Sequence, residues 1–319
     1  PERALAEAKR ETERLRMPLD ERRFLIVTGK GGVGKTTVTA AYATALAARG
    51  KRVLVAMCNA KERMSAMLGS DLIGTDVMAV APNVWAVNMT PETALEEYGM
   101  MALKSKALYS LLFDNKYVRV FFRAVPGMSE WAMLGKAWFH TTETTQDGSP
   151  KYDVVILDAP ATGHGLDMLR VPKVIVDVVP PGLLRRDAER AWNMFRDADA
   201  TGVVLVTLPE ERPTTETIEL AGALTGELGM NISRVVVNGV LPPLFSREER
   251  DVLERLVVDP RDAGTSALDS ARIRSVRERV QAESLARLAK ELPIEPAFFP
   301  LLFEDAANPA AIRELAKRL

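Results

Sequence analysis

A glycine-rich loop between an apolar run and a helix-forming stretch limits the fold of this chain more than any other feature. The run Phe24-Leu25-Ile26-Val27 precedes the loop, and small residues from Val38 to Ala48 follow it. The loop consists of Gly29, Lys30, Gly31, Gly32, Val33, Gly34, Lys35, Thr36 and Thr37. This order of strand, glycine loop and helix is typical of a P-loop, in which backbone N–H groups surround a phosphate chain.

The residue types in the loop suit phosphate binding. Glycines allow the backbone to turn its N–H groups inward, and a helix starting near Thr36 adds the positive end of its dipole. We expect Lys35 to reach the β- and γ-phosphates as a point charge. We also expect the Thr36 hydroxyl to ligate Mg²⁺, with Thr37 beside it in the binding loop.

Lys30, the second residue of the loop, distinguishes this P-loop from the common form. A lysine there cannot easily fold back onto phosphates that its own loop already surrounds. In proteins with such a deviant loop, the lysine crosses a dimer interface to the partner's nucleotide; the alternative is a solvated lysine at the loop tip. If Lys30 acts in this way, its charge stabilises the leaving phosphate as an arginine finger does.

Composition excludes several classes of protein. The 319 residues suffice for one large or two medium domains, and 47% hydrophobic with 27% charged residues is ordinary for a globular protein. The net charge of −1 argues against a general nucleic-acid binder. The single cysteine, Cys58, leaves no internal disulfide and suits a reducing cytoplasm. There is no uninterrupted apolar run of membrane-spanning length, so we expect at most peripheral membrane contact.

Further apolar runs alternate with helical patterns along the chain. We expect strands at Val53–Met57, Val84–Val87, Tyr152–Leu157, Thr201–Leu208, Ser233–Val237 and Phe298–Leu302. Such alternation predicts an α/β fold, a P-loop NTPase with a mostly parallel sheet flanked by helices. Ligands bind at the carboxyl ends of such strands, where the P-loop, Asn59, Asp158 and Asn238 would meet in one nucleotide site.

Changes in composition divide the chain into an arm, a core and a helical insertion. A charge-dense helical arm is expected at 1–22. Residues 90–145 are rich in methionine and aromatic side chains at helical spacing, and 241–292 are charged and helical. The predicted division is a P-loop core made of 23–89, 146–240 and 293–319, and a helical subdomain made of 90–145 and 241–292.

Asp158 is the candidate for the second half of the phosphate site. It ends an apolar strand, where a carboxylate can hold Mg²⁺ directly or through water, as a Walker B aspartate does. The following segment, Ala159 to Gly165, places two glycines around His164. Such a segment can shift, and the N–H of Gly163 could sense a γ-phosphate, so we interpret it as a switch loop.

Several segments, in order along the chain, resemble the ArsA/GET family of deviant P-loop ATPases. Gly29 to Thr37 is similar to the family P-loop, with Lys30 as its signature lysine. Asp158 to Leu169, D-A-P-A-T-G-H-G-L-D-M-L, is similar to the second switch segment, D-x-A-P-T-G-H-T-L-R-x-L. Further matches are Pro209-Glu210 with Glu216, Val237-Asn238 with Pro242, and Phe299-Pro300-Leu301-Leu302. The family includes arsenite-efflux ATPases and the ATPases that deliver tail-anchored membrane proteins.

The resemblance implies ligands and partners as well as a fold. It implies ATP or ADP with Mg²⁺, with Asn238 reading the base and Pro300 and Leu301 near the adenine. It also implies a dimer, formed with a second copy or with a paralogous ATPase. In the leading hypothesis the helical segments form an apolar groove for a helical client protein, and the nucleotide controls client binding.

Three departures from the family pattern change what is expected. The first switch segment of the family reads D-P-A-H, whereas this chain has Asn59-Ala60-Lys61-Glu62. Asn59 can orient water but cannot accept a proton, so we expect weak hydrolysis, or hydrolysis completed by Asp158, Glu62 or a partner chain. No cysteine lies near Leu268 to Arg272, where the family has its zinc-binding C-x-x-C, so no zinc is expected. The cysteine triad of the arsenite enzymes is also absent.

Other functions remain open at this stage. One is a hydrolysis-deficient regulatory subunit paired with a competent paralogue. Another is a ParA/MinD-like spatial organiser, which shares the deviant loop; here the closing helix, Ala310 to Leu319, is short for a membrane anchor, and the large inserts disfavour this reading. An arsenite-pump ATPase is disfavoured because its cysteines are missing. The favoured interpretation is an ATPase of the targeting or chaperone type.

Overall fold

The fold is taken from a computed structural model of the chain, which describes residues 19–103, 127–160, 162–256, 266–302 and 307–319. Its centre is one eight-stranded sheet, with strand order β3-β4-β2-β5-β1-β6-β7-β8. The strands are β1 (Phe24–Gly29), β2 (Val53–Cys58), β3 (Met78–Ala81), β4 (Val84–Met89), β5 (Val154–Asp158), β6 (Thr201–Thr207), β7 (Ile232–Val240) and β8 (Pro296–Pro300). All neighbouring pairs are parallel except β3 with β4.

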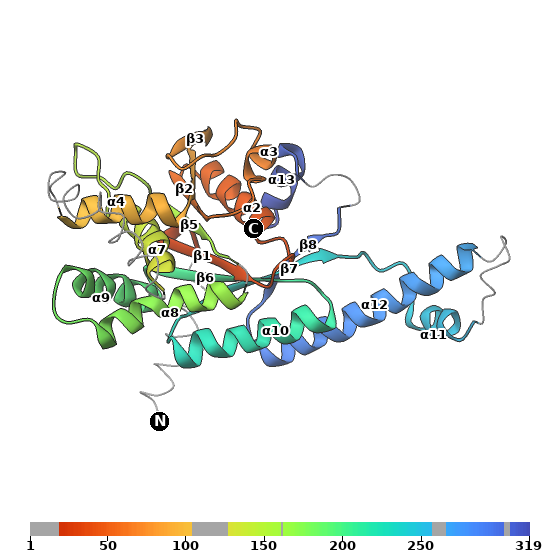
Figure 1. Cartoon of the computed structure of the whole chain (residues 1–319). Coiled ribbons are helices and arrows are strands. Elements are labelled where there is room, and N and C mark those ends of the chain that lie inside the picture. Colours follow the sequence, from red (N-terminus) through yellow and green to blue (C-terminus); the bar gives the residue numbers. More distant parts are fainter. Residues whose placement is uncertain (1–18, 104–126, 161, 257–265, 303–306) are drawn as a thin grey trace, which may run out of the picture.

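Helices cover both faces of this sheet (Figure 1). On the face drawn uppermost lie α2 (Lys35–Ala48), α3 (Met64–Leu68) and α13 (Pro309–Ala316). The remaining helices are α4 (Pro91–Leu103), α7 (Met128–His140), α8 (Thr162–Val178), α9 (Leu183–Arg196), α10 (Glu211–Gly222), α11 (Arg247–Arg255) and α12 (Ser266–Glu291). Short helical turns, η1 (Leu19–Glu21) and η2 (Ala223–Glu227), complete the described elements.

Alternation along the central strand explains why two helical layers are needed. In β1, Phe24 and Ile26 enter one apolar cluster, whereas Leu25 and Val27 enter a second cluster with α2 and α13. Every residue of β1 is buried. Because successive side chains of a strand point to opposite faces, a fully apolar strand is stable only when both faces are covered. The expected α/β fold with a mostly parallel sheet is therefore confirmed.

The strands expected from the sequence are all present, and one strand was missed. β3 is a four-residue strand at the edge of the sheet, and only Val80 of it is buried. It pairs antiparallel to β4 with a bulge between Ala79 and Ala81. A short, half-exposed edge strand carries little apolar periodicity, which is why its sequence gave no strand signal.

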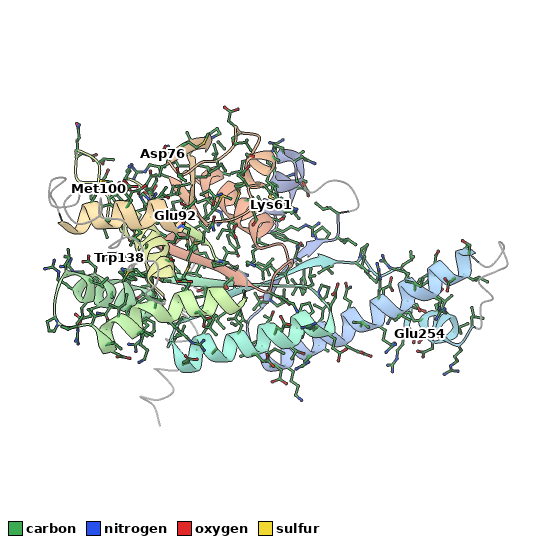
Figure 2. The ribbon with its side chains drawn as sticks, in the orientation of Figure 1. Lys61, Asp76, Glu92, Met100, Trp138 and Glu254 are labelled. Carbon is green, nitrogen blue, oxygen red and sulfur yellow. The ribbon has the colours of Figure 1, made fainter. Side chains whose placement is uncertain are left out.

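The two segments assigned to a helical insertion extend from opposite ends of the sheet in their described parts. Figure 2 shows Met100 of α4 and Trp138 of α7 at one end, and Glu254 of α11 at the other. α4 and α7 pack against each other, as do α11 and α12. Residues 104–126, which hold much of the aromatic-rich stretch, and 1–18 of the arm lie outside the described residues. The division into core and insertion therefore stays a prediction.

Candidate phosphate-binding site

The strands end where the candidate residues lie. β1 runs into the glycine loop, β5 ends at Asp158, and β2 ends one residue before Asn59. Since these strands are parallel and adjacent, with Val27 opposite Asp158 and Asp158 opposite Met57, their carboxyl ends share one edge. The structure thus brings the sequence-predicted residues to the position where α/β sheets bind ligands.

The glycines of the loop take backbone conformations that other residues avoid. Gly32 and Gly34 have φ angles of 84° and 93°, in the left-handed region. A Cβ at Gly34 would lie 2.2 Å from Nδ2 of Asn238, and a Cβ at Gly29 would lie 2.2 Å from the carbonyl oxygen of Val206. The loop therefore needs glycine for two reasons, its turn and the close approach of β6 and β7.

Asp158 is the centre of a hydroxyl network at the start of α2. Its Oδ2 accepts a hydrogen bond from Thr36 Oγ1 at 2.8 Å, and its Oδ1 accepts one from Thr39 Oγ1 at 3.3 Å. Thr39 was not singled out from the sequence, although its position three residues after Thr36 places it on the same helix face. The Lys35 ammonium donates to the carbonyl oxygen of Lys30 at 3.0 Å, which folds it over the loop.

Burial alters the pKa of both charged groups in this network. It raises the pKa of Asp158, an effect opposed by the Thr36 hydroxyl, the Lys35 charge and the Thr39 hydroxyl. It lowers the pKa of Lys35, with Asp158 opposing that change. Each group is therefore held in a site that disfavours its charge, so a ligand of complementary charge would be favoured.

The donor atoms at Asp158 fit a magnesium ion. A carboxylate and an adjacent threonine hydroxyl are the hard oxygen ligands that Mg²⁺ takes, and they already contact each other at 2.8 Å. Asp158 is 4% exposed, so a cation would offset the cost of burying its charge. Thr36 and Asp158 would hold the ion, which would neutralise charge on bound phosphates.

Lys30 lies at the tip of the loop and contacts its own chain. Its ammonium group donates to the Glu216 carboxylate of α10, and each side chain is 26% exposed. In the sequence, Glu216 appears only as part of a family motif, which does not indicate a contact with Lys30. Because the two residues are 186 positions apart, no local pattern could have revealed the pair.

The segment that begins at Asn59 is a tight turn held by its neighbours. Asn59 has φ of 46°, is exposed, and donates its backbone N–H to Met89 at 2.7 Å. The side chain of Asn88, at the end of β4, bonds both backbone groups of Ala60. Glu62 accepts bonds from the N–H and hydroxyl of Ser65 at the start of α3. Glu62 is thus engaged in capping, and the exposed residues of the turn are Asn59 and Lys61, neither of which carries a carboxylate.

Asn238 binds the loop itself, and a cavity lies beyond it. Its Nδ2 donates to the Val33 carbonyl at 2.9 Å. Leu301, just after Pro300 of β8, donates its N–H to the carbonyl oxygen of Val240. A cavity of about 510 Å³ is lined by Leu208, Pro209, Glu210, Gly239, Leu241, Val276, Arg277, Val280, Gln281 and Leu301. The lining comes from the segments at the carboxyl ends of β6 and β7 and from α12, is mostly apolar, and encloses a volume large enough for a base.

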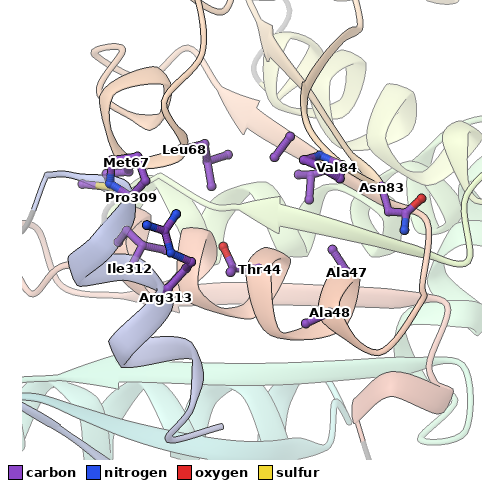
Figure 3. Close-up of a pocket in the computed structure, with 12 residues that line it drawn as sticks. Thr44, Ala47, Ala48, Met67, Leu68, Asn83, Val84, Pro309, Ile312 and Arg313 are labelled. Carbon is purple, nitrogen blue, oxygen red and sulfur yellow. The ribbon is translucent and has the colours of Figure 1, made fainter.

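A smaller cavity, of about 240 Å³, lies elsewhere on the molecule (Figure 3). It is bordered by Thr44 and Ala48 of α2, Leu68 of α3 and Ile312 of α13. These α2 residues lie roughly 14 Å or more along the helix from Lys35, at about 1.5 Å per residue. This cavity is therefore separate from the phosphate-binding loop.

The predicted switch segment begins α8. Gly165 is packed closely, since a Cβ there would lie 2.8 Å from the carbonyl oxygen of Pro160 and 3.4 Å from the Thr28 hydroxyl. Gly163 is exposed. Ala161 and the side chain of His164 lie outside the described parts, so the role of His164 stays a prediction.

Comparison with known proteins identifies the family. The family model described as anion-transporting ATPase matches residues 22–180, which include the glycine loop, Asn59 and Asp158. The chain belongs to the ArsA/GET family of ATPases. The recognition made from the sequence motifs is therefore confirmed. This match ends before β6 and does not include Asn238, Pro300 or Leu301, whose roles stay predictions.

Relatives of several kinds resemble the chain. ATPase BagA of Mycobacterium tuberculosis is 29% identical over 231 residues, 69% of this chain and 66% of BagA. ATPase GET3 of Kluyveromyces lactis is 26% identical over 254 residues, 69% of this chain and 72% of GET3. A putative arsenical pump-driving ATPase of Halobacterium salinarum is 28% identical over 242 residues, 71% of this chain and 37% of that protein. The chain thus spans about two thirds of the length of BagA.

Proposed function

We propose that this protein binds and hydrolyses ATP with Mg²⁺ as part of a dimer and uses the nucleotide to control binding of an apolar helical client. The observation that carries the proposal is the group formed by Lys35, Thr36 and Asp158 at the carboxyl edge of the sheet. Its cation, hydroxyl and carboxylate are the groups that phosphoryl transfer from a Mg²⁺-nucleotide requires.

Each residue has a distinct part in this proposal. Lys35 would leave the Lys30 carbonyl and bind the β- and γ-phosphates. Thr36 and Asp158 would hold the magnesium ion. The 510 Å³ cavity beside Asn238 and Leu301 would receive the adenine. Lys30, at the loop tip, would place its charge on the nucleotide of a partner chain, which is a second copy or a paralogue.

The exposed amide of Asn59 favours slow turnover. Hydrolysis needs a group that orients water against the γ-phosphate, and a carboxylate base accelerates such a step by about 10² to 10⁴-fold. Glu62, the nearest carboxylate in this segment, is bonded to Ser65. A second candidate function, a nucleotide-held regulatory subunit of a heterodimer, is supported by the same observation.

The structure gives less support to two alternatives, a ParA/MinD-like organiser with a membrane-binding closing helix and an arsenite-pump ATPase. The apolar face of α13 packs inward, where Ile312 and Leu315 are buried among α2 and α3, so this helix does not present a membrane-binding face. Among the described residues, no helix combines the length and apolar character needed to cross a membrane. Cys58 is buried, and burial raises the pKa of its thiol, which disfavours metalloid binding.

Binding of a fluorescent apolar helical peptide tests the client part of the proposal. The peptide would be measured with ATP, with ADP and without nucleotide, beside a polar helical peptide of equal length. We expect tight binding of the apolar peptide in only one nucleotide state, and loss of that difference in Lys35→Ala. Equal affinity in all three states would refute nucleotide control of client binding.

ATP binding and turnover by the purified chain distinguish the two candidate functions. Turnover that is lost in Lys35→Ala supports an ATPase that works without a carboxylate at position 59. Tight ATP binding without turnover supports the regulatory subunit.

A further inference from the structure

Within a single chain, the contact with Glu216 holds the side chain of Lys30, at the tip of the loop, against α10. The Lys30 ammonium binds the Glu216 carboxylate, and Nε of Arg212 donates to the same oxygen, Oε1, at 3.1 Å. Hydrogen bonding from Lys30, and then from Arg212, lowers the pKa of Glu216. Glu216 is therefore a charged acceptor for two cations, of which Arg212 is 84% exposed.

The carboxylate is presented by a firmly anchored helix. Thr214 and Thr217, on either side of Glu216 in sequence, are buried, and Leu220 is buried in the core one turn later. The hydroxyl of Thr215 accepts a bond from Arg287 of α12 at 2.7 Å. α10 is thus fixed to the body of the protein, whereas Lys30 belongs to the loop that would change its contacts when phosphate binds.

The same loop residue is tied to the phosphate-binding lysine. The carbonyl oxygen of Lys30 accepts the ammonium of Lys35 at 3.0 Å, while its side chain binds Glu216. If Lys35 turns to a phosphate chain, the backbone of Lys30 loses this contact, and the side-chain contact with Glu216 remains. Phosphate binding in one chain would therefore loosen Lys30 for use elsewhere.

We propose that Glu216 is a positioning residue that retains Lys30 within its own chain and is replaced by a partner's nucleotide when two chains associate. The inference rests on the proposed function, in which Lys30 acts across a dimer interface. A nucleotide phosphate chain carries more negative charge than one carboxylate, so electrostatic attraction favours the exchange. Since both side chains are 26% exposed, the pair is in contact with solvent and can be exchanged.

The expected effect is modest because partly exposed ion pairs are weak. Removing the negative charge of Glu216 should lower the protein concentration at the midpoint of ATP-dependent association by about two- to fivefold. The reason is that Lys30 would no longer have to leave a partner before it reaches the second chain. The direction of this shift matters more than its size, because a merely stabilising role for Glu216 would weaken association instead.

The test compares Glu216→Gln with Glu219→Gln, which changes an exposed glutamate on the same helix. Sedimentation velocity with ATP measures association across a range of protein concentrations, and turnover per chain is measured over the same range. We expect both midpoints to fall for Glu216→Gln, to stay near wild type for Glu216→Asp, and to be unchanged for Glu219→Gln. Melting temperatures verify that the variants fold.

A double-mutant cycle with Lys30→Ala identifies the cause. If Glu216 acts through Lys30, Glu216→Gln has no further effect in the Lys30→Ala background, and a persistent effect there would overturn the inference. The inference would also be overturned if association and turnover need Lys30 but do not change in Glu216→Gln. In that case the proposed function would stand. Turnover that survives Lys30→Ala and does not depend on protein concentration would instead refute the dimeric function and, with it, this role of Glu216.

Discussion

The phosphate loop and the Asn59 turn lie on neighbouring strands, yet they are built differently. Around the loop, Asp158 is buried and receives two hydroxyls, and Lys35 is bonded to the loop backbone. In the turn, Asn59 is exposed, and the carboxylate of the turn itself, Glu62, is bonded to Ser65 at the start of a helix. The difference separates binding from chemistry: the first region has the groups that hold a phosphate chain, and the second lacks a free base to activate water.

The largest effect is expected from removing the cation of the loop. Lys35→Ala should reduce ATP turnover by at least about 100-fold, because a lost charge at the transferring phosphate costs about 3 kcal/mol of transition-state stabilisation. Lys51→Ala, beyond the other end of α2, is the control and should keep wild-type turnover. A steady-state phosphate-release assay measures both variants. Turnover in Lys35→Ala similar to wild type would place the chemistry outside this loop.

Adding a methyl group at a loop glycine should lower the free energy of unfolding by an amount that depends on the space around that glycine. Gly34→Ala should cost about 2 kcal/mol of unfolding free energy, because the left-handed φ is strained and the Cβ displaces the Asn238 amide. Gly32→Ala should cost about 1 kcal/mol, since its φ is strained but the space around its Cβ is open. Denaturant unfolding without nucleotide measures the two costs. Equal costs for the two variants would show that the Asn238 side chain moves away from the new methyl group without loss of stability.

A carboxylate at position 59 should add to the Asn59 turn the catalytic base that it lacks beside the phosphate loop. Asn59→Asp should raise turnover by about 10²-fold, the lower end of the acceleration by a carboxylate base, because a carboxylate can accept a proton from the attacking water. Aspartate tolerates the left-handed φ of 46°, so stability should change little. Asn83→Asp, at a second left-handed asparagine with φ of 59°, is the matched control. No gain in Asn59→Asp would mean that water is positioned by another group.

The smallest effect concerns the stability of the buried carboxylate. The pKa of Asp158 is raised by burial, so without ligand its charge destabilises the folded state at neutral pH. Stability should fall as the pH rises from about 4, the ordinary carboxyl pKa, to the raised value of the folded protein. Asp158→Asn should remove this fall and stabilise the protein without ligand at pH 7, while abolishing stabilisation by Mg²⁺-ATP.

A second aspartate, Asp153, is expected to change the pH dependence of stability in the opposite direction, so it serves as a control for the stability measurement. The Arg52 side chain holds the pKa of Asp153 below its ordinary value, through contacts of 2.9 and 3.1 Å. Asp153→Asn should therefore destabilise the protein above about pH 4, and the loss should disappear as the carboxylate protonates in acid. Denaturant unfolding between pH 3 and 8, roughly spanning both ranges, compares the two variants. The same sign for both would contradict the burial argument.

Local patterns in the chain were enough for the fold and for the list of loop residues. Strands such as Phe24–Gly29 are continuous apolar runs, and the glycine loop has a fixed spacing, so each is recognisable within a few residues. The edge strand β3 was missed because its apolar signal is short and half-exposed. The motif matches also led to the correct family, since they recur in a set order.

Contacts between distant residues were decided by tertiary structure alone. Glu216 lies 186 positions from Lys30, and Asn238 lies 205 positions from Val33, yet both pairs are hydrogen-bonded. The parallel sheet causes this, since each crossover returns the chain to the same edge and brings the ends of β1, β6 and β7 together. Residue types along the chain thus determine which groups are available for phosphate binding. Only the folded sheet determines which partner each of these groups contacts.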